Sequence, residues 1–118
     1  MLNVNELNKF LESKKLTVLG QMTGTDTLNM VNASGNAVAN QFVLFLNFGD
    51  TTVKAFQSYS TIVAVECKDW IILDSKALEY SSTTTKYLKQ FIKDDGTKKD
   101  IQKRIDKGFY PTLELNSK

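Results

Sequence analysis

Between residues 16 and 73 the chain is a succession of short runs rich in β-branched and aromatic residues, and no other pattern constrains its fold as strongly. The connections between these runs are too short to hold the helical crossover that parallel neighbours require. The sequence therefore predicts an antiparallel sheet, with Gly49-Asp50 as the clearest hairpin turn. The predicted strands are Leu16–Met22, Thr27–Val31, Ala37–Phe48, Thr51–Tyr59, Thr61–Lys68 and Trp70–Leu73.

One of these runs, Phe42–Phe48, is apolar at nearly every position. A strand with one face in solvent normally alternates between apolar and polar residues, because successive side chains point to opposite faces. We therefore expect this run at the centre of the sheet, covered on both faces by the terminal helices.

Helical spacing replaces the strand pattern on either side of the sheet. Residues 4–14 carry apolar side chains three and four positions apart, with Asn3 or Asn5 as N-cap. A helix after residue 80 has an apolar stripe and a left-handed stop at Gly96. The stripe consists of Tyr87, Leu88, Phe91 and Ile92, and the candidate caps are Ser82, Thr83 and Thr84. A last helix begins at the capping box Thr97–Asp100 and stops at Gly108.

The chain closes with an alternating run at residues 112–115, which predicts an edge strand because Pro111 precedes it. The predicted fold class is α+β, an antiparallel β-sheet of about five to seven strands with a short N-terminal helix and two C-terminal helices. Residues 1–118 are expected to form a single globular domain. Only residues 116–118 resemble a tail.

The composition argues against an enzyme. The chain contains no histidine, which removes the commonest general base and the commonest transition-metal ligand. Cys67 lies in an apolar β run and is expected to be an inert strand residue. Asp69, Asp74 and Glu79 match no metal-binding motif and are expected to be solvated loop acids. We therefore expect no catalytic residue, no metal site and no cofactor.

The sequence also predicts where the protein resides. A single cysteine cannot form an internal disulfide, and the amino end carries polar residues where a secretory signal has an apolar core. The longest dense apolar run, residues 42–46, is far shorter than the ~20 residues of a membrane helix. We expect a cytoplasmic protein with no membrane partner.

Positive charge gathers in the last third of the chain, although the net charge is only +2. Residues 1–80 hold six Lys against eight Asp or Glu, whereas residues 81–118 hold eight Lys and one Arg against five. A helix start with free N–H groups, hydroxyls and nearby lysines can hold a phosphate or a carboxylate. The candidate partner- or anion-binding residues are Ser82, Thr83, Thr84, Lys86, Lys89, Lys93, Lys99, Lys103 and Arg104. The simpler interpretation, that hydroxyls cap the helix and lysines solvate it, stays open.

Several short motifs in the second half of the chain carry a family resemblance. They are SYSTIVA at residues 58–64, YSSTTTKY at residues 80–87 with Phe91, a charged helix ending at residues 105–110, and LELN at residues 113–116. Over residues 58–116 the chain resembles a family of small uncharacterised bacteriophage proteins. The resemblance implies a phage or mobile-element origin and a life in the cytoplasm of an infected bacterium. It brings no established activity, so no catalytic residue is carried over.

Such phage proteins often act by binding host enzymes, defence complexes or nucleic acid. We expect a non-enzymatic, phage-encoded protein that engages and inhibits a host or defence macromolecule, such as a protein or a nucleoprotein complex, with an anti-CRISPR-like inhibitor as the specific version. The alternative is a non-specific nucleic-acid-binding accessory protein that uses the C-terminal lysine-rich helices. The oligomeric state stays open.

Overall fold

In the computed structural model, which describes residues 1–117, six strands form one sheet whose spatial order is the order of the chain. The strands are β1 (Gly24–Val31), β2 (Ala37–Phe48), β3 (Thr51–Ser58), β4 (Thr61–Cys67), β5 (Trp70–Asp74) and β6 (Thr112–Leu113). All neighbours from β1 to β5 are antiparallel, whereas β6 runs parallel to β5 at the edge of the sheet. The predicted α+β class and the edge position of the last strand are confirmed.

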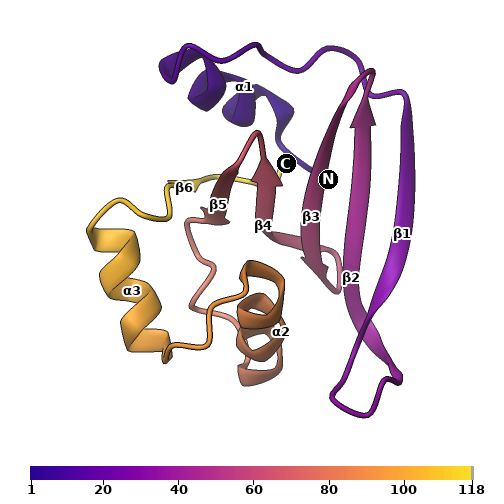
Figure 1. Cartoon of the computed structure of the whole chain (residues 1–118), viewed down its shortest axis with the longest axis vertical. Coiled ribbons are helices and arrows are strands. Elements are labelled where there is room, and N and C mark those ends of the chain that lie inside the picture. The colour runs from indigo at the N-terminus through magenta and orange to yellow at the C-terminus, as the bar shows by residue number, and fades with distance from the viewer. Residues whose placement is uncertain (118) are drawn as a thin grey trace.

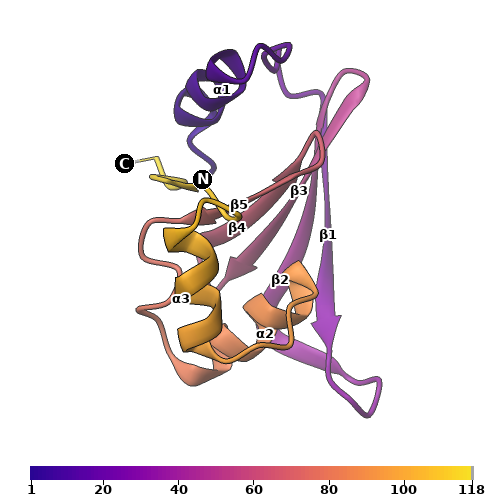
Figure 2. The same cartoon turned by 60° about the vertical axis from the view of Figure 1, so that its left-hand side comes forward.

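Three helices accompany the sheet: α1 (Val4–Ser13), α2 (Ser82–Ile92) and α3 (Lys98–Asp106). Figures 1 and 2 show α1 at one end of the molecule and α2 with α3 at the other, while β1 lies along the side away from α3. Asn3 caps α1, as predicted, by accepting a hydrogen bond from the Glu6 N–H. The two chain ends lie next to each other, since the Ser117 N–H donates to the Met1 carbonyl over 3.0 Å.

The sheet separates two hydrophobic cores. Ala55 of β3 packs with Leu7 and Leu11 of α1, whereas the next residue, Phe56, packs with Leu88 of α2. Adjacent strand residues point to opposite faces, so α1 covers one face and α2 covers the other. Phe56 is fully buried, which contributes up to about 3 kcal/mol of hydrophobic stabilisation.

The predicted strand Leu16–Met22 is wrong, because this segment connects α1 to β1 without regular secondary structure. Leu19 nevertheless lies buried in the core beside α1. The Asn8 side chain replaces a strand neighbour: its Oδ1 accepts from the Leu19 N–H at 2.8 Å, and its Nδ2 donates to the Leu19 carbonyl at 3.1 Å. A side-chain amide can thus satisfy a buried backbone segment that has no partner strand.

The expected central position of Phe42–Phe48 is also wrong. Its strand, β2, lies second from the edge, and Phe42, Leu44 and Phe45 are only half-buried. The central strands β3 and β4 take the fully buried positions instead. Neither α1 nor α2 extends over the whole of β2, so part of its apolar surface faces solvent.

The predicted C-terminal tail is wrong for its first two residues. Asn116 pairs with Leu2 in an isolated bridge, and its side chain bonds the N–H of Ile62 at 2.8 Å and the carbonyl of Ile62 at 3.0 Å. Ser117 is bonded to Met1. Lys118, the last predicted tail residue, lies outside the described residues.

Candidate binding surface on α2 and α3

The start of α2 is built by Ser81, not by the predicted caps Ser82, Thr83 or Thr84. Ser81 accepts a hydrogen bond from the Thr84 N–H at 3.2 Å and has the extended backbone of an N-cap. Thr84 is buried, and its hydroxyl bonds the Ser58 hydroxyl of β3 at 2.9 Å. A chain of hydroxyl groups therefore fixes the start of α2 to the sheet. Thr84 is part of this chain and is not exposed to a partner.

Beyond this cap, one side of α2 and the first residue of α3 enclose a cationic groove of about 370 Å³. Its lining residues are Ser82, Thr85, Lys86, Lys89 and Lys98. No carboxylate lines this groove, so three lysine and two hydroxyl-bearing side chains border the same space. Opposed lysines on adjacent elements attract anionic groups, because the cost of bringing like charges together falls when an anion binds between them.

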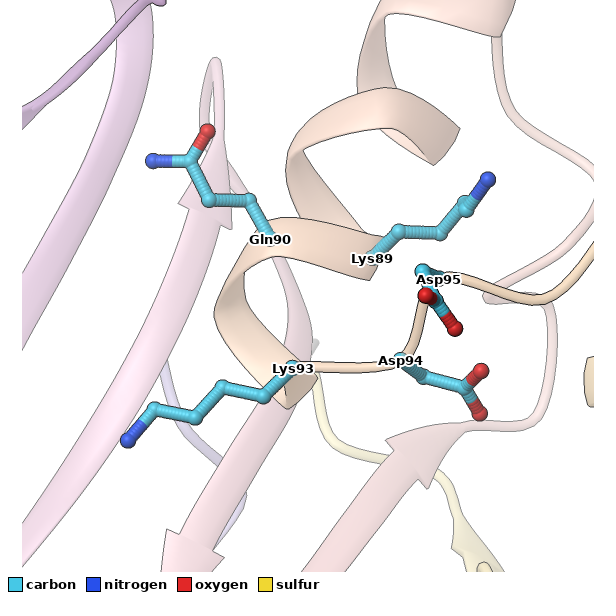
Figure 3. A pocket seen from close by; sticks show the side chains of 5 residues that line it. All are labelled: Lys89, Gln90, Lys93, Asp94 and Asp95. Atoms are coloured by element: carbon cyan, nitrogen blue, oxygen red, sulfur yellow. The ribbon is translucent and has the colours of Figure 1, made fainter.

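A second hollow of about 420 Å³ adjoins the groove, since both are lined by Lys89. Its other residues are Gln90, Lys93, Asp94 and Asp95. Figure 3 shows the Lys93 side chain pointing away from Lys89, on the opposite side of the helix from both aspartates. This second hollow has mixed charge, so the cationic character belongs to the first groove.

Asp94 organises the connection between α2 and α3. Its side chain is 8% exposed and accepts from Arg104 Nη1 at 2.8 Å, from the Tyr110 hydroxyl at 2.7 Å and from the Gly96 N–H at 2.9 Å. Burial opposes its charged form, but the hydrogen bonds from Gly96 and Tyr110 and the Arg104 charge together hold the pKa of Asp94 below its usual value. Arg104 therefore pairs with Asp94 rather than along its own helix with Asp100.

This connection ends α2 earlier than predicted. Lys93, not Gly96, adopts the left-handed conformation, with φ 56°. Gly96 is required for space instead, because an added Cβ would approach Arg104 Nη1 to 2.8 Å and the Asp100 Cβ to 3.0 Å. The predicted Thr97–Asp100 capping box is confirmed, as is the left-handed stop at Gly108, with φ 83°.

The structure divides the predicted site residues into groups. It brings Ser82, Lys86 and Lys89 together in the groove. Thr83, Lys93, Lys99 and Lys103 are exposed outside the groove, Thr84 is buried, and Arg104 is paired with Asp94. Sequence reasoning missed Thr85 and Lys98. The capping box marks Lys98 as the first residue of α3, but its place beside α2 depends on the path of the connection between the two helices.

The Cys67 thiol is free and buried in the sheet. Burial raises the pKa of the Cys67 thiol, although Lys68 opposes the shift, so the sulfur is held in its protonated form at neutral pH. Among residues 1–117, no group of three or more Cys, Asp or Glu side chains is placed to hold a metal ion. No helix in this part of the chain is long and apolar enough to cross a membrane.

The expectation that Asp74 is a solvated loop acid is wrong. Asp74 ends β5 and is buried. It accepts from the N–H of Leu115 at 3.0 Å, from the N–H of Lys76 at 3.1 Å and from the hydroxyl of Tyr80 at 3.2 Å. Sequence spacing could not reveal this role, because Leu115 is 41 residues away.

The fold and the groove define a small α+β protein with one locally cationic surface. The chain belongs to a family of unknown function, DUF8033, whose profile matches residues 25–107. The matched region runs from β1 to the end of α3, and it leaves out α1 and β6. No curated protein and no solved structure matches the chain.

Proposed function

We propose that this chain is a phage-encoded, non-enzymatic binding protein that engages and inhibits a host or defence macromolecule, with the cationic groove as its contact surface. The observation that carries the proposal is the convergence of Lys86, Lys89 and Lys98 on one space without a carboxylate between them. Phage origin rests on the resemblance of residues 58–116.

An acidic protein surface fits this groove better than a long nucleic acid. Non-specific nucleic-acid binders contact many phosphates and are strongly basic, whereas this chain has a net charge of only +2. The adjoining hollow contains Asp94 and Asp95, which would repel a continuous phosphate backbone. A compact group of three lysines matches a local cluster of Asp or Glu on a protein partner.

Two matched triple variants test the groove. In K86Q/K89Q/K98Q the groove loses its three charges, while K9Q/K15Q/K76Q removes the same number of charges from exposed lysines elsewhere. The wild type and the control triple should capture the same stoichiometric protein from a bacterial lysate, and the groove triple should capture at most a tenth as much. Equal capture by both triples would refute the groove as contact surface.

The specific version is an anti-CRISPR-like inhibitor. Expression of the wild type in bacteria with active CRISPR interference should restore plaque formation by a targeted phage, and the control triple should do the same. The groove triple should lose this protection. If the wild type protects the phage against none of the CRISPR types tested, the anti-CRISPR version is wrong. The capture experiment then shows whether the protein binds another target.

The alternative is a non-specific nucleic-acid-binding accessory protein, which the same lysine side chains favour. A gel shift with single- and double-stranded DNA and RNA separates the two. Three phosphate contacts through Lys86, Lys89 and Lys98 would give a slope of log affinity against log salt of about −2 to −3. Retardation at moderate salt that only the groove triple abolishes would favour the alternative over a protein partner.

A further inference from the structure

The two edges of the sheet are built very differently. β6 closes one edge with two residues and follows Pro111, which shortens the exposed ladder. β1 forms the other edge with eight residues, and no strand of the described residues 1–117 lies beyond it. Its sequence, GTDTLNMV, contains no proline and no lysine, the residues that normally protect a free edge.

The edge strand β1 is held in a fixed position. Met30 is buried in the core beside α2, and Gln90 of α2 donates from Nε2 to the Val31 carbonyl at 3.1 Å. The free edge is therefore rigid before any partner arrives, which lowers the entropic cost of pairing.

The hydrogen-bond pattern shows which groups of β1 face outward. The Tyr59 N–H bonds the Asn40 carbonyl at 2.7 Å, so even-numbered residues of β2 bond β3 and odd-numbered residues such as Val43 and Phe45 bond β1. Their partners in β1 are Leu28 and Asp26. Beyond the register shift that follows Asn29, the Val31 carbonyl is already bonded to Gln90. Before that shift, the N–H and C=O groups that alternate with those of Leu28 and Asp26 and point away from the sheet belong to Thr25, Thr27 and Asn29.

This outward set is symmetric about Thr27. We propose that the protein forms a two-fold dimer in which β1 pairs antiparallel with β1 of a second copy, centred on Thr27. In this register Thr25 of one copy bonds Asn29 of the other, and the two Thr27 residues bond each other. Every outward backbone group of the three residues then has a partner, and the two sheets become one.

The side chains of β1 fit a second copy of the same strand as the occupant. Asp26 is the one charged residue of β1, and the two-fold register places it opposite Leu28 of the other copy, so the two carboxylates do not oppose each other. Leu28 is 60% exposed in the monomer and gains a cross-strand neighbour. At the axis Thr27 faces Thr27, a favourable cross-strand pair.

Charges placed at the axis test the register. Thr27 is exposed and its outward N–H has no role in the monomer, so T27K and T27E should fold like the wild type, as checked by circular dichroism. Sedimentation velocity from micromolar to millimolar concentration should show a monomer–dimer equilibrium for the wild type and for the control T17K, an exposed threonine in the α1–β1 connection. T27K alone and T27E alone should each be at least tenfold weaker in association, because like charges meet at the axis.

Mixing the two variants gives the decisive result. T27K with T27E should associate at least as well as the wild type, because opposite charges then face each other across the axis. A wild type that stays monomeric at every concentration would overturn the proposal. Only a strand of another protein could then pair with the free edge of β1. Dimerisation of T27K equal to the wild type, or no recovery in the mixture, would overturn the two-fold register.

Discussion

Two aspartates with little-exposed side chains tie distant parts of this chain together, and they do so with different partners. Asp74 holds the C-terminal segment to the end of β5 through neutral donors, and no lysine or arginine of residues 1–117 pairs with it. Asp94 holds α3 and Tyr110 to the end of α2 and has a cation, Arg104, among its donors. Each carboxylate also accepts a hydrogen bond from a tyrosine hydroxyl, Tyr80 for Asp74 and Tyr110 for Asp94.

The difference shows what a buried carboxylate requires. A charge can be buried when hydrogen bonds replace its hydration, whether or not an opposite charge is present. The neutral arrangement uses two backbone N–H donors, of which Lys76 is local and Leu115 is brought close by the fold. The ion-paired arrangement needs fewer, but it depends on one long side chain that is 41% exposed.

The largest effect is expected at the neutral site. Asp74→Ala removes the acceptor of the buried Leu115 N–H and of the donors on Lys76, Tyr80 and Asn116, so the free energy of unfolding should fall by about 3 kcal/mol. Urea denaturation of the variant and the wild type measures the change. A loss below that of Asp94→Ala would show that the neutral donors contribute less than the single ion pair.

Asp94→Asn should cost about 2 kcal/mol, because Arg104 then has no opposite charge and one amide oxygen replaces two carboxylate oxygens. The lowered pKa of Asp94 stabilises the fold above the usual aspartate value of 3.8, and this contribution is lost as the pH falls through the lower folded-state pKa. The stability difference between wild type and variant should therefore shrink below about pH 4. A constant difference between pH 2 and pH 7 would contradict this origin.

The two tyrosines give a matched alkaline test of both sites. Burial and the neighbouring carboxylate raise the pKa of Tyr80 and of Tyr110 to about 12. Their stabilisation is complete below the unfolded value of 10.0 and is lost as the pH rises through about 12. Tyr80→Phe and Tyr110→Phe should each cost about 1 kcal/mol at neutral pH and make the loss of stability above pH 10 less steep. Equal alkaline profiles for wild type and both variants would exclude this linkage.

The smallest losses of stability are expected when the cations near the two aspartates are changed. One nitrogen of Arg104 serves both oxygens of Asp94, so Arg104→Lys should cost less than about 1 kcal/mol. Lys76 touches Asp74 through its backbone N–H alone, and Lys76→Gln should change stability by only a few tenths of a kcal/mol. A larger loss in Lys76→Gln would mean that the Asp74 site also depends on a cation.

Much of the fold could be predicted from local patterns. The turn at Gly49-Asp50, the Asn3 cap and the Thr97–Asp100 capping box all follow from interactions within a few residues, and each is present. The largest failures involve contacts between separate segments, whereas the displaced ends of α2, at Ser81 and Lys93, are local shifts of a few residues. Leu19 is satisfied by the Asn8 side chain rather than by a strand, and no periodicity reports such a contact.

The binding surface, too, could be predicted only in part from local patterns. The hydroxyl run and the lysines at 86 and 89 mark the start of α2 in the sequence, and three of the nine predicted residues meet in the groove. Lys98 joins them because the α2–α3 connection folds back, and Arg104 leaves them because Asp94 binds it. Both outcomes depend on the path of residues 93–97, which local propensity does not specify.

The sequence by itself determined the kinds of elements, their order and most of their ends, because helix and strand periodicity, turns and caps are short-range properties. Only the tertiary structure decided that β2 lies near an edge, that β6 is parallel to β5, that Asp74 is buried, and that Asp94 pairs with Arg104. These features arise from packing and hydrogen bonds between segments far apart in the chain, whose free energy depends on the whole fold.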